Sequence, residues 1–407
     1  MQIHRLALKN FKCFKEVDIS FSKITLLTGE NSSGKSSLIY GILAPLQSIS
    51  LYGNSFPLYL SLNGDYVNMG GGEDVSFNHN TSSKLGINLN LVTDFEEFIF
   101  DTNWGFEPKN RYPVINDLKM SSRLEQIEVT KELNGDYIAS LNLRDGAVVN
   151  SVNLRTNNID DITKEHYGSY PIIDAFSDSL YNSLDEEFNF VSSFRLHPDR
   201  TYYISKSNNK VDKFGSGYID QILDWHDKQS NKLDNLVSLL KSINILSDIR
   251  SHKLLGGRFD IEVKVKSKSK WESLADVGFG ISQFLPIIVA DLQLSDNSTL
   301  IMSQPEIHLH PSVQANLGDY LVKQVNERNK NYIVETHSEY LLNRMRLLIV
   351  KGEIQPKDVA VYYFENSVKN GSIAHRIEFT KDGQILNAPK GFFETYMIDT
   401  MDIALNA

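Results

Sequence analysis

The sequence predicts an α/β protein whose sheet is mixed or parallel. Three short apolar runs, residues 24–27, 300–302 and 332–334, lie next to stretches with helical spacing. Such alternation predicts a parallel sheet, because crossover helices join parallel strands and cover both faces of the sheet. We expect four regions: a first lobe of the α/β head at 1–90, a compact α+β insertion at 91–257, a second lobe of the head at 258–350, and a small C-terminal subdomain at 351–407.

The remaining elements follow from apolar periodicity. Alternating apolar residues predict strands at 3–9, 17–21, 85–91 and 137–143, and Asn134-Gly135 is typical of a hairpin turn. Helical spacing of apolar residues predicts helices at 38–46, within 218–249 and at 284–290. The sequence contains no heptad run long enough for a coiled-coil arm, so the middle of the chain is expected to be compact.

Size and composition are those of an intracellular globular protein. The 407 residues are 41% hydrophobic and 23% charged, which suits two or three subdomains with sizeable cores. No window approaches the roughly 20 apolar residues of a membrane span, and residues 1–5 lead into a strand pattern without a secretory h-region. Cys13 is the single cysteine, which excludes an internal disulfide. We expect a cytoplasmic protein with no membrane partner.

Charge limits the part that nucleic acid can play. The net charge of −10 argues against a surface built wholly for nucleic acid. Lys264, Lys266, Lys268 and Lys270 alternate, so a strand would place them on one face. They suit either a contact strip for DNA phosphates or lysines that protect an exposed edge strand, and the second interpretation is favoured.

The most specific motif follows the first apolar run. Residues 29–36 fit GxxxxGK[ST] at every fixed position and open a helix, as a P-loop does. Gly29 and Gly34 allow a tight turn whose N–H groups face phosphate, Lys35 is expected to reach the β- and γ-phosphates, and the Ser36 hydroxyl is expected to bind Mg²⁺. The other residues expected at the nucleotide are Asn31, Ser32, Ser33 and Ser37. A plain Gly/Ser turn is the alternative, and the complete match favours ATP and Mg²⁺ as cofactors.

A second Gly-rich turn opens the helix predicted near residue 284. The stretch DVGFGISQ at 276–283 resembles the signature motif of ABC-type ATPases. In that family a helix N-terminus and a serine bind the γ-phosphate held by the P-loop of another subunit. The resemblance implies that ATP is contacted across a dimer interface by Gly280, Ile281, Ser282 and Gln283.

A histidine follows the last apolar run. His337 lies between Thr336 and Ser338. The same resemblance implies that it is a switch histidine, which contacts the γ-phosphate and positions the attacking water. A helix cap at Thr336 or Ser338 is the plainer interpretation, and both can hold at once.

The Walker B region departs from the ABC pattern. Most relatives place two acids after this buried strand, one for Mg²⁺ and one to polarise water, whereas this chain has Ser303 and Gln304. Neither is a general base, and serine is a poor Mg²⁺ ligand compared with a carboxylate. Glu306 is the nearest acid, and it either enters the site or begins a helix. The candidate catalytic residues are therefore His337, Gln304 and Glu306, and slow hydrolysis or nucleotide binding alone is expected.

Other positions carry lesser expectations. His308 and His310 form an HxH pair that suits a D-loop at a subunit interface better than a metal site, because no third ligand is recognisable. Lys12 and Phe14 are candidates for the adenine or ribose side of the nucleotide. Gln47 is the nearest Q-loop candidate and thus a further possible ligand of Mg²⁺.

Taken together, the motifs make the chain similar to the prokaryotic ABC-type (RecF/SMC-like) AAA ATPases, which include the ATPase half of OLD-family proteins. The resemblance rests on NFKCF at 10–14, GENSSGKSS at 29–37, DVGFGISQFLP at 276–286, QPEIHLHPSVQ at 304–314 and ETHSEYLLNR at 335–344. It implies an ABC-type ATPase head. The tail, at 358–364 and 389–393, resembles the C-terminal domain of unknown function that marks one branch of these ATPases.

Members of that branch resemble regulatory ATPases of anti-phage defence, Septu-like systems among them, whose nucleotide state controls a nuclease or another effector. The segment after His337 is too short for a Toprim nuclease domain together with the tail, so an effector is expected to be a separate protein. The resemblance implies a homodimer or higher homo-oligomer. Two alternatives stay open: a RecF-like ATPase that clamps DNA, and a scaffold subunit stabilised by nucleotide.

Overall fold

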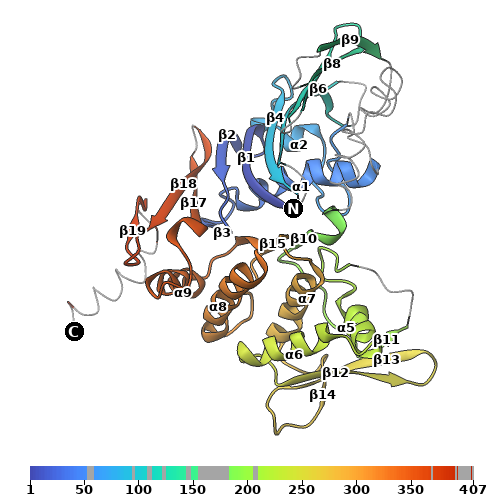
Figure 1. The fold of residues 1–407 in the computed structure, drawn as a ribbon, viewed down its shortest axis with the longest axis vertical. Coiled ribbons are helices and arrows are strands. Elements are labelled where there is room, and N and C mark those ends of the chain that lie inside the picture. The colour runs from blue at the N-terminus through green and yellow to red at the C-terminus, as the bar shows by residue number, and fades with distance from the viewer. Residues whose placement is uncertain are drawn as a thin grey trace.

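One large sheet runs through the molecule, which is known from a computed structural model. The structure describes residues 1–52, 59–93, 97–107, 112–121, 125–143, 148–154, 183–204, 210–367, 370–389, 392 and 405. In these residues the large sheet has 15 strands, and a second sheet of four strands lies at the opposite end of the molecule from β9 (Figure 1).

Five strands of the large sheet are parallel. In spatial order they are β10 (Phe188–Val191), β15 (Thr299–Ser303), β16 (Asn331–Glu335), β3 (Ile24–Gly29) and β17 (Val359–Ser367). Their side chains are buried on both faces: Ile301 and Ile333 belong to one hydrophobic core, and Leu300 and Val334 to the other. Burial on both faces explains why these segments read as continuous apolar runs.

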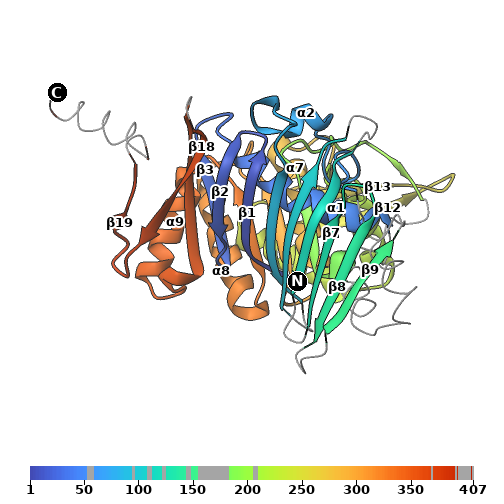
Figure 2. The same ribbon diagram turned by 90° about the horizontal axis from the view of Figure 1, so that it is seen from above.

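The rest of the large sheet is antiparallel. It continues from β17 through β18 (Gly371–Phe379), β2 (Phe14–Ser20), β1 (Gln2–Phe11), β4 (Leu85–Val92), β5 (Glu97–Gly105), β6 (Val114–Ser121), β7 (Glu125–Lys131), β8 (Tyr137–Leu143) and β9 (Val148–Leu154), and β19 (Ile385–Leu386) pairs with β18. Figure 2 shows the strands from β2 to β9 as one curved layer. The β7–β8 hairpin turns at Asn134-Gly135, as predicted, and Gly135 takes the positive φ that this turn requires.

Helices cover both faces of the parallel strands. The P-loop helix α1 (Lys35–Tyr52) shares a core with β1 and β4, so it lies between the parallel and antiparallel strands. The opposite face is covered by α7 (Phe279–Gln293), α8 (Pro311–Arg328) and α9 (Glu339–Val350) (Figure 1). Short helical segments are α2 (Gly72–Val75), η1 (Phe77–His79) and η2 (Pro356–Asp358). Helices on both faces of these five parallel strands, within a mixed sheet, confirm the predicted α/β class.

The small sheet packs beside two further helices. Its strands are β11 (Tyr202–Tyr203), β13 (Arg258–Lys264), β12 (Asp248–Leu254) and β14 (Glu272–Ser273). The helices are α5 (Tyr218–Asp227) and α6 (Asn231–Ser242), and their apolar residues join the same core as α7. Figure 1 shows this group below α7.

The structure distributes two of the expected regions differently. The range 91–257, expected as one insertion, supplies β5–β9 to the antiparallel sheet, β10 to the parallel strands, and α5, α6 and β12 to the small-sheet end. The C-terminal range contributes β17, which pairs with β3 in the centre of the large sheet. Residues 390, 391 and 393 of the expected tail motif lie outside the described residues.

The lysine-rich stretch is not a strand. β13 ends at Lys264, and Lys266 begins a turn in which its N–H bonds to Ser269 Oγ at 3.2 Å. The expectation of four lysines on one strand face is therefore wrong, because alternating charge in an exposed turn imitates the strand period. Among the helices that the structure describes, none is long and apolar enough to cross a membrane.

Candidate nucleotide site

The P-loop joins the end of β3 to the start of α1. Gly29 has φ +131°, and a Cβ there would lie 2.2 Å from the carbonyl oxygen of Phe364, so β17 excludes any side chain at this position. Gly34 has φ +107°. Ser33 Oγ donates to the Glu30 carbonyl at 2.7 Å and holds the loop closed. The two glycines are required by conformation and by close approach, as the motif predicts.

The P-loop lysine lies inside its own loop. Lys35 Nζ donates to the carbonyl oxygens of Gly29 at 3.1 Å and Glu30 at 2.5 Å. Burial lowers the pKa of Lys35, and the nearby carboxylates of Glu335 and Glu30 oppose that shift. Two neutral carbonyls are weak partners for an ammonium group, so a phosphate is the stronger ligand for it. Asn31 and Ser32 are exposed on the outside of the loop, and Ser37 is half-buried in the first turn of α1.

Three strands end beside the P-loop. β15, β16 and β3 are consecutive and parallel, with Ser303 in register with Glu335 and Glu335 in register with Leu27. Ser36 Oγ donates to Glu335 Oε1 at 2.8 Å, and the Glu335 residue is only 5% exposed. Gln304 N–H bonds to the Glu335 carbonyl at 2.6 Å. The carboxyl ends of these strands therefore gather the P-loop serine, Gln304 and a buried carboxylate.

Glu306 supports the backbone of the segment around His337 instead of facing open solvent. Its Oε1 accepts the His337 N–H at 2.7 Å, and the residue is 8% exposed. Burial raises the pKa of Glu306, and its hydrogen bonds and Arg195 only partly offset this effect. We expected Glu306 either to enter the site or to begin a helix. In the structure its carboxylate instead fixes the backbone of His337.

His337 has an exposed imidazole beside the P-loop. Partial loss of solvent around the ring and the positive charge of Lys35 lower the pKa of His337 from its ordinary value, so the ring is mostly neutral at pH 7. Ser338 caps α9 by accepting the Leu341 N–H at 3.0 Å, while Thr336 Oγ1 accepts the Ser338 N–H at 3.0 Å. The helix cap at Ser338 is confirmed, and it leaves the His337 side chain available to a ligand.

The signature segment lies against a different part of the molecule. Gly280 packs so closely on the loop after β15 that a Cβ would lie 2.4 Å from the His308 carbonyl oxygen. Phe279 stacks on His197 with centroids 4.2 Å apart and contacts His308 at 4.6 Å. Gly278, the N-cap of α7, is exposed. The Ile281 N–H donates to the Gly278 carbonyl at 3.0 Å, and the N–H groups of Phe279 and Gly280 have no helical residue four positions before them to accept a hydrogen bond.

Two signature side chains point into their own subunit. Ser282 is 2% exposed, and its hydroxyl donates to the Phe279 carbonyl at 2.9 Å. Gln283 is 3% exposed, and its amide donates to the carbonyls of Arg195 and Leu196 at 3.3 and 3.4 Å. In this conformation Asp276 and Gly278 are the exposed residues of the segment, and Phe279, Gly280 and Ile281 are half-buried.

Sequence comparison assigns this site to a family. The family model described as the AAA ATPase domain matches residues 1–94 and 106–342, which is most of the chain and includes the P-loop, the signature segment and His337. The chain belongs to the AAA ATPase domain family. A second model, described as a protein of unknown function (DUF3696), matches residues 354–403. No curated protein matches the sequence.

Solved structures similar to this AAA ATPase are heads of SMC proteins. The SMC head domain from Thermotoga maritima has 14% identity and a TM-score of 0.39, and the match covers 92% of this chain and 98% of that chain. An SMC head bound to the C-winged helix domain of ScpA has 15% identity and a TM-score of 0.44, covering 94% and 99%. An SMC head bound to the C-terminal domain of ScpA, derived from Pyrococcus furiosus, has 11% identity and a TM-score of 0.40, covering 99% of each chain. TM-scores below 0.5 mark a distant likeness and assign no further property to this chain.

Two residues of the AAA ATPase that were expected to contact the nucleotide have other contacts in the structure. Gln47 lies twelve residues after Lys35, about 18 Å along α1. Its amide bonds to the Ser61 carbonyl at 3.2 Å and accepts the Val67 N–H at 2.8 Å, so it is not the Mg²⁺ ligand expected. Phe14 is fully buried beneath Gly34 and packs edge-on against Phe364, so it supports the loop and cannot stack on a base.

Other expectations have partial outcomes. Lys12 is half-buried, and its Nζ donates to the Asp74 carbonyl at 3.4 Å. His310 caps α8, where its Nδ1 accepts the Ser312 N–H at 3.3 Å, and His308 is exposed against Phe279. The two histidines are thus used separately, as a cap and as a contact of the signature segment.

Two residues of the site were not assigned a role from sequence. Arg195 is 3% exposed and donates to the carbonyls of Ser303 and Gln304, both at 3.2 Å. Because Gln283 bonds to the Arg195 carbonyl, Arg195 links the signature helix to the end of β15. Burial lowers the pKa of Arg195 to about 10, so it stays charged at pH 7. The other residue is Glu335. Two features of the sequence could have identified it: it is an acid at the end of a buried strand, and the Walker B positions lack an acid.

Proposed function

We propose that this AAA ATPase binds ATP with Mg²⁺ between two copies of the chain and acts as a nucleotide-dependent regulatory subunit. The observation that carries the proposal is the separation of two half-sites. The P-loop packs on β17 and Glu335, whereas the signature end of α7 packs on His197 and His308. Each half offers amide donors and a helix N-terminus, and a second copy brings one half to the other.

The residues present fit a Mg²⁺-nucleotide. Ser36 Oγ and Glu335 Oε1 are oxygen donors 2.8 Å apart at the foot of the P-loop, and hard cations prefer oxygen ligands. A bound Mg²⁺ would neutralise phosphate charge there. Lys35 would bind the phosphates, and neutral His337 would hydrogen-bond at the γ-phosphate.

Slow turnover is part of the proposal. Gln304 stands where a water-polarising acid is expected, and an amide does not accept a proton. Glu306 is engaged with the His337 backbone. A long-lived ATP state suits a switch: closure would displace α7 and the small-sheet end relative to the P-loop, and a bound partner would respond to the two populations.

We place the effector on a separate chain and the system in anti-phage defence, with a nuclease as the expected effector class. Support comes from the resemblance of the motifs to the defence branch and from the tail match to a family of unknown function. Loss of plaque protection in a Lys35→Ala strain would test this assignment, and full protection by that strain would contradict it. A DNA clamp is the rival, which salt-dependent duplex binding by the isolated protein would favour.

The central experiment measures mass in solution with and without ATP and Mg²⁺. We expect the wild type to change from a smaller to a larger assembly when nucleotide is added, because ATP completes the interface. Lys35→Ala should remove this change, since the phosphates lose their main cation. Lys357→Ala, at an exposed lysine in η2 just before β17, is the matched control and should assemble normally. An assembly that is identical with and without ATP in the wild type would contradict the proposal.

A further inference from the structure

The Walker B position lacks an acid, but the sheet supplies one on the neighbouring strand. Ser303 ends β15, Glu335 ends β16, and the two are register partners. Side chains of register partners on adjacent strands point to the same face of a sheet. The Glu335 carboxylate therefore leaves the same face as the Ser303 hydroxyl, one strand nearer to the P-loop.

Glu335 lies close enough to the P-loop to bind Mg²⁺ in place of the Walker B acid. β16 lies between β15 and β3, so an acid on β16 is adjacent to the P-loop strand. Ser36 Oγ already donates to Glu335 Oε1 at 2.8 Å, so the carboxylate reaches the first turn of the P-loop helix. A carboxylate that is 5% exposed and touches the P-loop serine is a preformed pair of oxygen ligands.

Other acids near the P-loop do not fit this role. Glu306 Oε1 is held by the His337 N–H, and the residue is enclosed beneath the switch segment. The Glu30 side chain is exposed on the loop. Two carboxylates at 303 and 335 would stand about 5 Å apart, where like charges oppose each other, so the small serine at 303 is compatible with an acid at 335.

We propose that Glu335 has taken over the Mg²⁺-holding role of the Walker B acid, so that the metal is bound by Ser36 and a carboxylate from β16 instead of β15. This inference rests on the proposed function, because it requires a bound nucleotide. It assigns Mg²⁺ binding to Glu335. The expected slow hydrolysis is still explained by the amide at position 304, where an acid would polarise water.

The test separates metal binding from nucleotide binding. The affinity of a fluorescent ATP analogue is measured in EDTA and in Mg²⁺, and Mn²⁺ bound with ATP is counted by electron paramagnetic resonance. In the wild type we expect Mg²⁺ to tighten binding. In Glu335→Gln that gain should fall by about 10- to 100-fold, as for loss of a metal-site partner. In EDTA its affinity should be equal or higher, because a negative charge beside the phosphates is removed.

Two further variants make the result specific. Ser303→Asp combined with Glu335→Gln moves the acid back to β15, and we expect it to regain part of the Mg²⁺ effect and of the Mn²⁺ signal. Glu327→Gln, an exposed acid on α8, should behave as wild type. Binding in EDTA reports that each variant is folded, and Ser36→Ala should lose the same Mg²⁺ gain.

The outcomes are distinguishable. A wild type that binds no ATP under either condition overturns the proposed function together with this inference. A wild type that binds ATP, with a full Mg²⁺ effect and Mn²⁺ signal retained in Glu335→Gln, overturns the assignment of Glu335 alone.

Discussion

At the scale of single residues, a buried carboxylate supports the backbone at the carboxyl-terminal edge of the parallel strands. Glu306 has one carboxylate oxygen on the His337 N–H, and Thr336 and Arg195 also favour its charged form. Burial outweighs these interactions and raises the pKa of Glu306, so the buried carboxylate carries a net desolvation penalty. Glu306 therefore lowers stability while it holds the backbone of His337.

We predict that Glu306→Gln stabilises the protein increasingly as the pH rises. A raised pKa means that the folded state binds the proton more tightly, so the stabilising contribution of this group exists below its unfolded pKa of about 4.3 and is lost as the pH rises through its folded pKa. Glutamine keeps an Oε1 acceptor for His337 and does not titrate. Each unit of raised pKa corresponds to about 1.4 kcal/mol in the difference between the two proteins.

Thermal unfolding of both proteins between about pH 5 and pH 8 measures this difference. A difference in Tm that stays constant over the range, or shrinks as the pH rises, would show that the Glu306 carboxylate is not penalised by burial. Glu353→Gln, an exposed acid after α9, is the control and should give no such trend.

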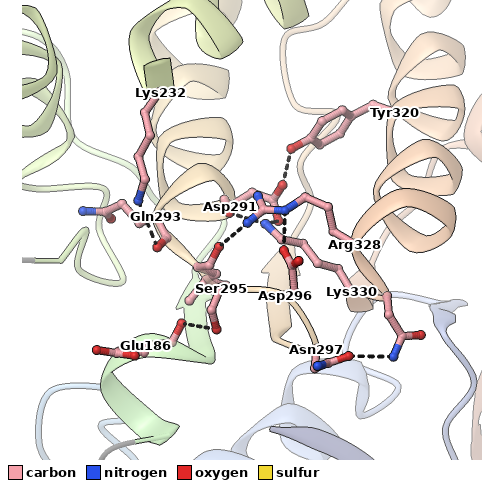
Figure 3. Close-up of polar contacts among 12 residues, drawn as sticks. Glu186, Lys232, Asp291, Gln293, Ser295, Asp296, Asn297, Tyr320, Arg328 and Lys330 are labelled. Atoms are coloured by element: carbon pink, nitrogen blue, oxygen red, sulfur yellow. Dashed lines mark hydrogen bonds and ion pairs between the residues drawn. The ribbon is translucent and has the colours of Figure 1, made fainter. Parts of the chain in front are cut away.

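At the scale of elements, one buried charge cluster ties α7, α8 and β16 together. Asp291 on α7 is paired with Lys330, just before β16, with Nζ to Oδ1 at 3.2 Å, and both side chains are 1% exposed. Tyr332 donates to Asp291 at 3.0 Å. Tyr320 on α8 also donates to Asp291, as Figure 3 shows. This cluster lies at the strand starts, the opposite edge from the nucleotide site, so it anchors the signature helix to the sheet.

We predict that Lys330→Met destabilises the protein by about 3–5 kcal/mol, because it leaves the Asp291 carboxylate buried without a counter-charge. Asp291→Asn combined with Lys330→Met should be less destabilising than the single change, since it removes both charges and keeps an acceptor for the tyrosines. Denaturant unfolding of the three proteins gives the comparison. A double variant that is less stable than Lys330→Met would mean that the charge pair itself is not the source of the effect.

Local patterns were enough for some elements and not for others. The P-loop, the buried strands at 300–302 and 332–334 and the hairpin at Asn134-Gly135 were predictable, because each depends on neighbouring residues. The turn at 265–270 was not, since alternation alone does not separate a strand from exposed lysines. The relation of Glu335 to Ser36 depends on the strand order β15-β16-β3, which arises from crossovers far apart in sequence.

For the whole molecule, the parallel strands separate two cores, and the two half-sites lie on structures that belong to different sides of the sheet. The P-loop helix α1 belongs to the core shared with β1 and β4, and the signature helix α7 belongs to the core shared with α5 and α8. The His337 segment, held by Glu306, and Arg195, bonded to the end of β15, lie between them. These contacts connect the two cores beside the proposed nucleotide site.

The reciprocal use of half-sites is testable by mixing two defective variants. Gly278→Asp fits the backbone, since φ is −52° and a Cβ meets no atom within 4 Å, and aspartate is a good N-cap. We expect it to fold normally and to block ATP-driven assembly, because its carboxylate faces the γ-phosphate of the other copy. Gly278→Asn has the same shape without the charge, and it should assemble as wild type.

Lys35→Ala carries a defective P-loop and an intact signature end, and Gly278→Asp carries the reverse. A mixed dimer of the two therefore contains one intact composite site and one site in which both halves are defective. We predict that neither variant assembles alone with ATP, and that an equimolar mixture forms dimers containing both chains, detected by mass after one chain is tagged. The mixture would stay monomeric if each subunit used its own signature end, since no chain would then contain an intact site. That result would contradict the two-copy arrangement even though both chains remain folded.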